Sequence, residues 1–507
     1  MRNSTLLGWR LALLALAVTV TPAWASDDRP RPAPIVLEGE LTGELHETYL
    51  ELPFEVPPGI ERVSVSLDYD QNNRTVIDMG LRDPNGLRGW SGGARRSFTL
   101  SASEATPSYT PGPIVPGTWR LILGAPNIRA SSRSAYRAEI TLTPAGEQVP
   151  ESAFFDGPIR ADPAWYRGDF HTHTGHSDGS CESLAGRRVP CPAFRTLEAA
   201  RRAGLDFVAV TEHNTVSHHG PLRELQPYYD TILIIPGREI TTFKGHLNVF
   251  GPLGELDFQL GSPRLPSLDQ TLKEVEGRGG FSSINHPGMP SGEACMGCGW
   301  IVGDIDFSQV AAVEVVNGGT MLLTRSPEGP LSHIPFWEGL LDQGHRLAAI
   351  AGSDNHDPDN PGRQSPVGRP TTVVYAANLS QRALFDAVRA GRVFVDLEAI
   401  PGRHLDLTAK SMGAEVRMGG VLRLAQGETA SLTVETHGVE NAEIEWVAGA
   451  NAPALRLSSQ ELVQLDGSRR QTATLTGVGR SYWVRANIRN QEGEIVLIGS
   501  PVYIEEK

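Results

Sequence analysis

One short stretch of the 507-residue chain concentrates side chains that bind metal ions. GDFHTHTGHSDG, at 168–179, places three histidines and the carboxylate of Asp178 between two glycines. His171 and His173 are two residues apart on an extended segment, so both side chains leave the same face. Imidazoles and carboxylates together suit divalent ions such as Zn²⁺, Mn²⁺ or Fe²⁺. The stretch therefore predicts a metal site.

Similar groups follow several later apolar runs, each at the point where a strand is expected to end. One histidine alone at such a point is usually an ordinary polar side chain, but the ordered set is hard to explain in that way. A single tetrahedral zinc takes only about four ligands, so we expect two or three divalent ions, Mn²⁺, Zn²⁺ or Fe²⁺. The predicted ligands are His171, His173, Asp178, His213, Glu239, His246, His286, Asp354 and His356.

The segment that carries these groups alternates between strand-like and helix-like patterns. FVAV (207–210) and VEVV (313–316) are typical of buried strands, whereas TLEAARRAG (196–204) and QRALFDAVRAG (381–391) have helical spacing and end at glycine. Alternating strands and helices predict a largely parallel sheet, either covered on both sides or closed into a barrel. In a barrel, the carboxyl ends of all strands share one rim, where active sites are assembled.

The ordered motifs HTHTGHSDG, VTEHN, PGREI, GHLNV, INHP and GSDNH, over about 165–400, resemble those of the PHP (polymerase and histidinol phosphatase) superfamily. The resemblance implies an α/β fold, a distorted seven-stranded (β/α) barrel, here flanked by two β-sandwich domains. It also implies three groups of ligands. A first ion would be bound by His171, His173, Glu239 and Asp354, a second by Asp178, His213 and His356, and a third by Glu239, His246 and His286.

Other polar residues near the expected strand ends are candidates for contact with substrate. His176 and His218 are candidate proton donors, with His219 as a further possibility, and the alternative is that these histidines are solvent-exposed. Arg238 is a candidate for binding an anionic oxygen, as is Arg363, although most arginines form surface salt bridges. Many relatives have aspartate at the position of Glu212, which leaves the role of this glutamate open.

Four regions are expected along the chain. Residues 1–25 combine arginines, a ten-residue apolar run and AWA, a pattern typical of a secretory signal peptide. Turn-punctuated extended runs predict an N-terminal β-sandwich, resembling a jelly roll, at 26–150. The metal-binding domain occupies 151–401. A second β-sandwich is expected at 402–507.

Charge and cysteine content limit the partners and the compartment. The net charge of −14 argues against nucleic acid as a ligand. No stretch after the leader reaches the roughly 18 apolar residues of a membrane helix, so we expect a periplasmic or secreted protein without a membrane span. The four cysteines allow three disulfide pairings, of which Cys181–Cys191 with Cys295–Cys298 closes the shortest loops. A four-cysteine zinc site is the alternative.

Hydrolysis is the reaction that such a metal site predicts, because water between two cations ionises near neutral pH. We expect a phosphodiesterase that cleaves small organic phosphodiesters by attack of a metal-bridging hydroxide. GDFHTHT and the terminal SPVYI resemble an exported PHP branch that includes carbaryl hydrolases and small-organophosphate phosphodiesterases. Carbamate or carboxylic ester hydrolysis is the alternative, and a noncatalytic metal- or glycan-binding protein is the third. The natural substrate and the oligomeric state stay open.

Overall fold

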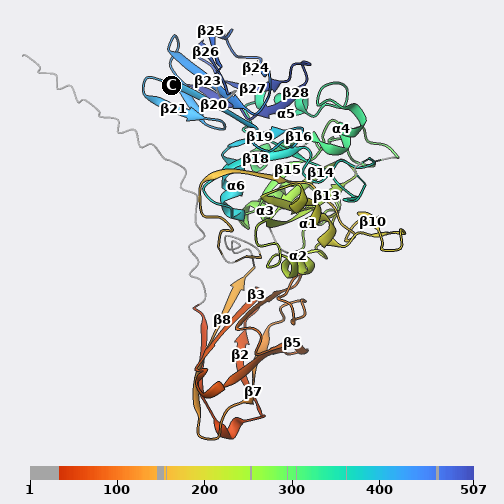
Figure 1. Cartoon of the computed structure of the whole chain (residues 1–507), viewed down its shortest axis with the longest axis vertical. Helices are drawn as coiled ribbons and strands as arrows, with labels where there is room; N and C mark the ends of the chain where they lie inside the picture. Colours follow the sequence, from red (N-terminus) through yellow and green to blue (C-terminus); the bar gives the residue numbers. More distant parts are fainter. Residues whose placement is uncertain are drawn as a thin grey trace, which may run out of the picture.

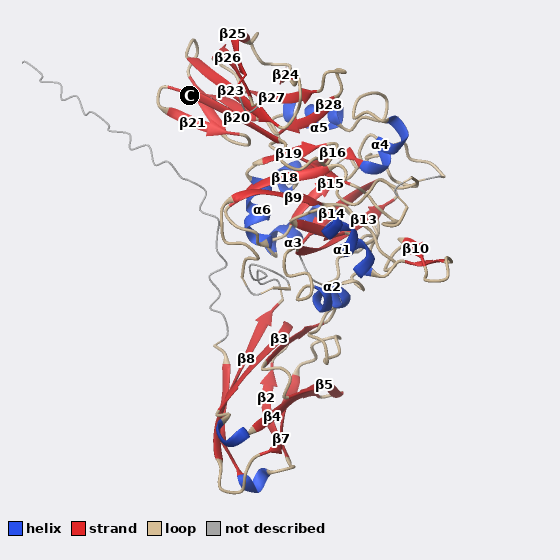
Figure 2. Cartoon of the chain, viewed as in Figure 1, coloured by secondary structure: helices blue, strands red, loops and turns tan. Residues whose placement is uncertain are grey.

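The computed structural model describes residues 33–145, 154–155, 157–251, 254–293, 295–303, 305–360, 362–463 and 468–507. The predicted signal peptide at 1–25 lies outside these ranges. The described chain is elongated, with the N-terminal strands at one end and the C-terminal strands at the other (Figure 1). Strands form most of its regular structure, and the α-helices gather around the middle, whereas the short blue segments among the N-terminal strands are the 3-10 turns Gly43–Leu45 and Asn72–Arg74 (Figure 2).

The N-terminal part consists of two four-stranded antiparallel sheets, ordered β1-β8-β3-β6 and β2-β7-β4-β5. Apolar residues alternate along each strand, so Val63 and Val65 of one sheet and Leu121 and Leu123 of the other share a single core. The strands are β1 (Ile35–Thr42), β2 (Tyr49–Val56), β3 (Ile60–Tyr69), β4 (Val76–Asp83), β5 (Gly86–Gly92), β6 (Ser97–Ser101), β7 (Gly117–Asn127) and β8 (Arg133–Pro144).

The middle of the chain forms most of a large mixed sheet, whose order begins β17-β16-β15-β14-β13-β12-β9-β18-β19. Strands β9, β12 and β13 run parallel to one another, as do β15, β16 and β17. These strands are β9 (Ala164–Asp169), β12 (Phe207–Val210), β13 (Leu233–Thr242), β14 (Gly245–Phe250), β15 (Phe281–Ile284), β16 (Ala312–Asn317), β17 (Ala348–Gly352), β18 (Thr371–Ala376) and β19 (Val393–Asp396).

Six α-helices occur in the described residues, and all belong to this middle part. None of them is long and apolar enough to cross a bilayer. They are α1 (Ala193–Arg202), α2 (His219–Leu225), α3 (Asp269–Gly277), α4 (Gly318–Thr324), α5 (Ile334–Asp342) and α6 (Gln381–Arg389).

The prediction of a distorted seven-stranded (β/α) barrel is wrong. Among the described residues the backbone ladder runs from β17 to β22 without closing. Strand β14 returns antiparallel directly after β13, and β18 pairs antiparallel with β9, so the regular strand–helix alternation of a barrel is lost. Where β17 meets β18, the Thr372 hydroxyl bonds the backbone of Ala351 in place of a ladder. The architecture is a mostly β, open mixed sheet.

A compact aromatic core lies beneath the first parallel strands. The Phe170 ring centroid is 4.9 Å from that of Phe207 and 5.1 Å from that of Phe250. Gly168 permits this packing, because a Cβ on it would lie 2.3 Å from the Phe207 ring. The core therefore fixes the backbone immediately before the HTHTGHSDG stretch.

The C-terminal strands belong to two sheets. Five of them form a separate antiparallel sheet, β21-β20-β23-β26-β25, whereas β22, β24, β27, β28 and β29 extend the large sheet. The junction is the antiparallel pairing of β28 with β19, at Phe394↔Gly499 and Asp396↔Leu497. The strands are β20 (His404–Ser411), β21 (Ala414–Arg417), β22 (Val421–Leu424), β23 (Thr429–His437), β24 (Glu443–Ala448), β25 (Arg456–Val463), β26 (Arg469–Thr476), β27 (Tyr482–Arg489), β28 (Ile495–Gly499) and β29 (Val502–Glu506).

Candidate metal centre

Glu239, on β13, is the centre of a cluster that contains all nine predicted ligands. Its side chain is 1% exposed. Oε2 lies 3.0 Å from His213 Nδ1 and 3.4 Å from His171 Nε2. Oε1 lies 3.1 Å from His246 Nδ1 and 3.4 Å from His286 Nε2. One buried carboxylate therefore contacts imidazoles from four separate segments.

The strand ends explain this convergence. His171 and His173 follow β9 directly, and Asp354 and His356 follow β17. A backbone bridge between Thr172 and Asn355 aligns these two segments. Asp354 has a φ of 52° and His286 a φ of 27°, a left-handed conformation that is unfavourable for residues with a Cβ. The backbone is therefore strained at Asp354 and His286, where it directs their side chains into the cluster.

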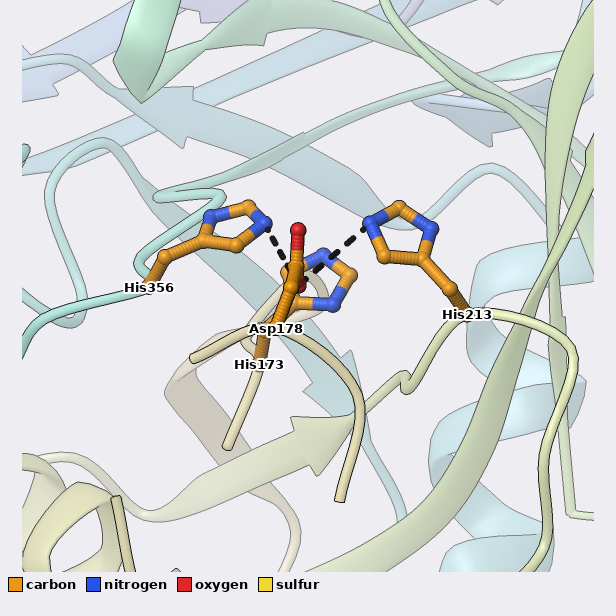
Figure 3. A group of neighbouring side chains, drawn as sticks. All are labelled: His173, Asp178, His213 and His356. Carbon is orange, nitrogen blue, oxygen red and sulfur yellow. Dashed lines mark ion pairs between the residues drawn. The ribbon is translucent and has the colours of Figure 1, made fainter. Parts of the chain in front are cut away.

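Four of the ligands form a group that opens towards solvent. One ligand atom from each of His173, Asp178, His213 and His356 lies within 4.8 Å of the others. Asp178 Oδ1 is 3.3 Å from His356 Nε2 and 3.7 Å from His213 Nε2 (Figure 3). The Asp178 side chain is 59% exposed, whereas His173 is buried. This group therefore combines a fixed buried side with an accessible carboxylate.

The other ligands form deeper groups. His171, His173 and Asp354 make one, and His171, Glu239 and His286 make another. Asp354 Oδ1 lies 3.3 Å from His171 Nε2 and 3.2 Å from His173 Nε2. His173 thus belongs both to a deep group and to the open one, whereas the family resemblance assigned it to the first ion alone.

Several buried ligand atoms in the described cluster lie near other ligand atoms but form no hydrogen bond of good geometry. They are His171 Nε2, both ring nitrogens of His173, and Glu239 Oε2. A buried polar atom without a partner is costly, and most such atoms in native proteins are paired. Divalent ions would satisfy these atoms, and the imidazole and carboxylate set has the chemistry to bind them. The described residues therefore fit metal ions, whose identity and number the geometry leaves open.

The electrostatics of the cluster favour the metal-binding forms of Glu239 and His173. For His171, His213, His286 and His356, burial alone would lower the pKa, but the neighbouring carboxylates outweigh burial and raise the pKa, so these imidazoles must lose a proton when a metal binds. Burial raises the pKa of Glu239, but His213, His171 and His246 outweigh burial and hold that pKa well below its usual value. Burial, with help from the positive charges of His356 and His213, lowers the pKa of His173 to about 3. Glu239 is therefore ionised and His173 is neutral, with a free lone pair, as metal binding requires.

Glu314, on β16, is a functional residue that the sequence analysis missed. Its Oε1 lies 3.0 Å from His171 Nδ1, and its Oε2 accepts hydrogen bonds from the backbone N–H of His286 at 2.8 Å and from Asn317 at 3.1 Å. A carboxylate that accepts a hydrogen bond from the second ring nitrogen of a metal-binding histidine fixes the tautomer and the orientation of that histidine. The available signal was a charged residue inside the apolar run AVEVVN.

Glu212 shapes the loop that carries Asp178. Its side chain accepts hydrogen bonds from the Thr174 N–H at 2.9 Å, from the Thr174 hydroxyl and from the Ser177 hydroxyl. Glu212 is therefore a positioning residue for this loop.

The candidate substrate contacts have different surroundings. His176 lies in the Asp178 loop, with Nδ1 2.9 Å from the Ser217 hydroxyl. His218 is fully buried, with Nε2 2.9 Å from the carbonyl oxygen of Gly237, and burial lowers its pKa to about 3. His219 is also buried. His218 and His219 are therefore not the solvent-exposed groups that the sequence alternative anticipated.

Neither candidate arginine contacts the cluster. Arg238 precedes Glu239 on β13, and adjacent residues of a strand point to opposite faces. Its guanidinium donates a hydrogen bond to the Gly254 carbonyl. Arg363 is exposed. The expectation that Arg238 faces the reacting group fails because of the strand alternation that places Glu239 inside.

The cysteines form the two predicted pairs, Cys181–Cys191 and Cys295–Cys298, so the four-cysteine zinc alternative is excluded. The first pair joins Cys181 of β10 (Ser180–Glu182) to Cys191, the residue directly after β11 (Arg188–Pro190). Cys191 also hydrogen-bonds through its backbone to Gly175 at 2.7 Å and to Gly179 at 3.0 Å, on both sides of Asp178. This disulfide therefore supports the accessible rim of the metal centre.

Comparison with known proteins adds one distant similarity. No family model matches the chain. An uncharacterized protein of Methanocaldococcus jannaschii is 27% identical over 152 residues, which are 30% of this chain and 81% of that protein.

Proposed function

We propose that this protein is a metal-dependent hydrolase of phosphoric esters that acts on phosphodiesters of small organic molecules. The observation that carries the proposal is the Glu239-centred cluster, in which buried ligands without partners adjoin an accessible group at Asp178. A centre with only a structural role would be closed to solvent, whereas a catalytic one keeps a side open to water and substrate.

Charge balance supports an anionic substrate. The ligand set contains three carboxylates, Asp178, Glu239 and Asp354, with otherwise neutral imidazoles as required for binding. Two divalent ions would balance these carboxylates together with the neighbouring Glu314, and a third ion would leave an excess of two positive charges. A phosphodiester carries one negative charge and is attracted to such a site, whereas a carbamate or a carboxylic ester is neutral.

Buried and accessible residues of the centre would have different roles in hydrolysis. Bound divalent ions would supply Lewis acidity, which makes water a stronger nucleophile and neutralises charge that develops on the ester oxygens. Glu239 and His173 would connect the deep ligand groups to the accessible one. Glu314 would fix the orientation of the His171 ring. Asp178 forms the accessible edge against which a substrate would bind.

His176 is our candidate for the proton donor to the leaving alcohol. It shares the accessible loop with Asp178, and its Nδ1 contacts the Ser217 hydroxyl, which fixes the ring. Loss of a general acid slows esters of poor leaving groups most. His176→Asn should therefore slow an alkyl nitrophenyl diester less than a dialkyl diester. An equal loss on both would remove His176 from this role.

The proposal retains the resemblance of the metal-binding motifs to the PHP superfamily without its barrel. The two disulfides are compatible with an oxidising compartment, and on this basis we propose a periplasmic or secreted location.

The proposal is tested by loading the protein with Mn²⁺ or Zn²⁺ and comparing bis(nitrophenyl) phosphate, nitrophenyl phosphate and an aryl carbamate. We expect metal-dependent turnover that is fastest on the diester and lost in His171→Ala. The matched control, His437→Ala, changes an exposed histidine outside the cluster and should keep full activity. Preference for the carbamate would favour the alternative hydrolase, and bound metal without any turnover would favour a noncatalytic role.

A further inference from the structure

The segment that follows His286 brings a disulfide against the metal centre. His286 Nδ1 lies 3.1 Å from the carbonyl oxygen of Cys298, and His246 Nε2 lies 3.3 Å from that of Met296. The opposite ring nitrogens of these histidines face Glu239. Two predicted ligands are therefore connected through their rings to the CMGC loop.

The sulfur of Cys298 itself lies within reach of these ligands. One ring nitrogen of His246, one of His286 and Cys298 Sγ all lie within 4.8 Å of one another. Cys298 is 2% exposed, so its sulfur lies in the same buried environment as the imidazoles. Two histidines and one thiolate are normal zinc ligands, and a fourth position taken by water would complete a tetrahedral set.

We propose that Cys298 binds the metal ion at His246 and His286 when the Cys295–Cys298 disulfide is reduced, so that the redox state of this pair controls metal binding at this end of the centre. The inference uses the metal centre of the proposed function but not its substrate. In the disulfide form, Cys298 Sγ carries no thiolate charge and is a poor ligand, which leaves His246 and His286 as the donors of this group.

The burial of the two cysteines determines which sulfur a reductant attacks first. Cys295 is partly exposed, whereas Cys298 is buried. The thiolate of a dithiol reductant would attack Cys295 Sγ, breaking the S–S bond, and the electron pair would leave on Cys298 Sγ. The second thiol of the reductant would then displace Cys295, which takes up a proton. The protein pair gains two electrons, and the reductant becomes a disulfide.

The loop is held in place by contacts other than the disulfide. Gly297 has a φ of 78°, and a Cβ on it would lie 2.0 Å from the Thr242 carbonyl oxygen, so the loop lies directly on the β13–β14 turn. The Ile301 N–H also donates a hydrogen bond to the Lys244 carbonyl at 2.7 Å. These contacts, with the two ring contacts to carbonyls, would keep Cys298 near the histidines after reduction.

Two single variants of the full chain separate metal binding by sulfur from simple loss of the disulfide. Both Cys295→Ser and Cys298→Ser abolish the bond, but only Cys295→Ser leaves a thiol beside His246 and His286. Titration with Co²⁺ should produce a thiolate-to-cobalt charge-transfer band in Cys295→Ser and none in Cys298→Ser. The Co²⁺ affinity of this site should be at least about tenfold higher in Cys295→Ser, the lower end of the effect of a supporting contact.

A second measurement uses the unmodified protein. Dithiol treatment followed by alkylation and peptide mass analysis identifies which disulfide has opened, and bound Co²⁺ should then protect Cys298 more than Cys295 from alkylation. If folded Cys295→Ser, judged by circular dichroism, binds Co²⁺ without the charge-transfer band, the inference is overturned. Diester hydrolysis by the oxidised protein would remain unaffected, so this failure is distinct from failure of the proposed function.

Discussion

The imidazole of His171 and the carboxylate of Glu314 lie 3.0 Å apart, between Nδ1 and Oε1, and both side chains are almost completely buried. The remaining oxygen of Glu314 accepts a hydrogen bond from the backbone N–H of His286. One carboxylate of β16 therefore positions ligands that come from two different strand ends, although it is not itself among the predicted ligands.

Glu314→Gln should weaken metal binding by about 10- to 100-fold, the usual effect of losing a carboxylate behind a ligating histidine. A glutamine of the same volume has one acceptor oxygen and one NH2 group, which only donates, so its two ends cannot accept hydrogen bonds from both His171 and His286. Metal affinity is measured by competition with a chelator. Glu443→Gln, at an exposed position of β24, is the matched control. Equal affinities in the two variants would contradict the positioning role.

Asp178→Asn should release the ion of the accessible group while the deeper groups keep theirs. Among the described residues, Asp178 is the one carboxylate in the open group with His173, His213 and His356, and its exposure makes the fold insensitive to the change. Metal content should fall by about one equivalent, and kcat/KM should fall by about 10²-fold or more, the scale of losing one preorganised electrostatic group. Unchanged metal content with full activity would place the second ion elsewhere.

Replacing Cys181 and Cys191 together by alanine should affect both stability and the accessible ion. The disulfide closes a short loop, with a sequence separation of 10 residues, and its loss should cost about 2–4 kcal/mol. Binding of the accessible ion should weaken because the loop that carries Asp178 is no longer fixed through Gly175 and Gly179. Thermal unfolding and Mn²⁺ titration measure the two effects. Weakened binding in the deep groups alone would oppose this assignment.

Metal binding at the accessible group should strengthen as pH rises. Burial lowers the pKa of His356, but the hydrogen bond and charge of Asp178, with the charge of Asp354, outweigh burial and raise it to about 9. Metal-free His356 is therefore protonated at neutral pH, and an incoming ion must displace that proton. Competition with the His356 proton alone should increase the apparent Mn²⁺ affinity by up to about tenfold per pH unit until about pH 9.

The control for this pH dependence is His356→Gln, which has no proton to displace at that position. Its Mn²⁺ affinity should be lower than that of the unmodified protein and should rise less steeply with pH. Parallel slopes for the two proteins would show that a different group supplies the displaced proton.

Several of the nine clustered residues could be identified from the sequence because they share a simple pattern, a polar donor directly after an apolar strand, whereas Glu239 and His246 lie within β13 and β14. His171, His213 and Asp354 all follow this pattern, and strand ends that lie side by side bring such groups together. The barrel could not be inferred from the same pattern. The turn between Thr242 and Gly245 sends β14 back antiparallel, and a local reversal of this kind is not visible in hydrophobic periodicity.

Residues whose role depends on a partner far away in the sequence could not be identified from the sequence either. Glu314 lies within a run of valines, and only the fold brings its carboxylate against His171, which is 143 residues away in the sequence. Arg238 was assigned to the site because it is next to Glu239 in the sequence. Adjacent residues of a strand point to opposite faces, so the two side chains do not share a site. Cys298 was predicted as half of a disulfide, and its approach to His246 depends on the packing of two loops.

The pairing of β28 with β19 has a consequence for how this protein can be divided. A chain ending at residue 401 would lack β28 and would expose the free backbone groups of Val393–Asp396 to water. An uncovered apolar strand of this kind invites association with other chains, and natural proteins avoid it. The part of the chain that contains the candidate metal centre should therefore aggregate when it is produced without the C-terminal residues, so cutting the chain at that boundary is a poor way to obtain a smaller folded protein.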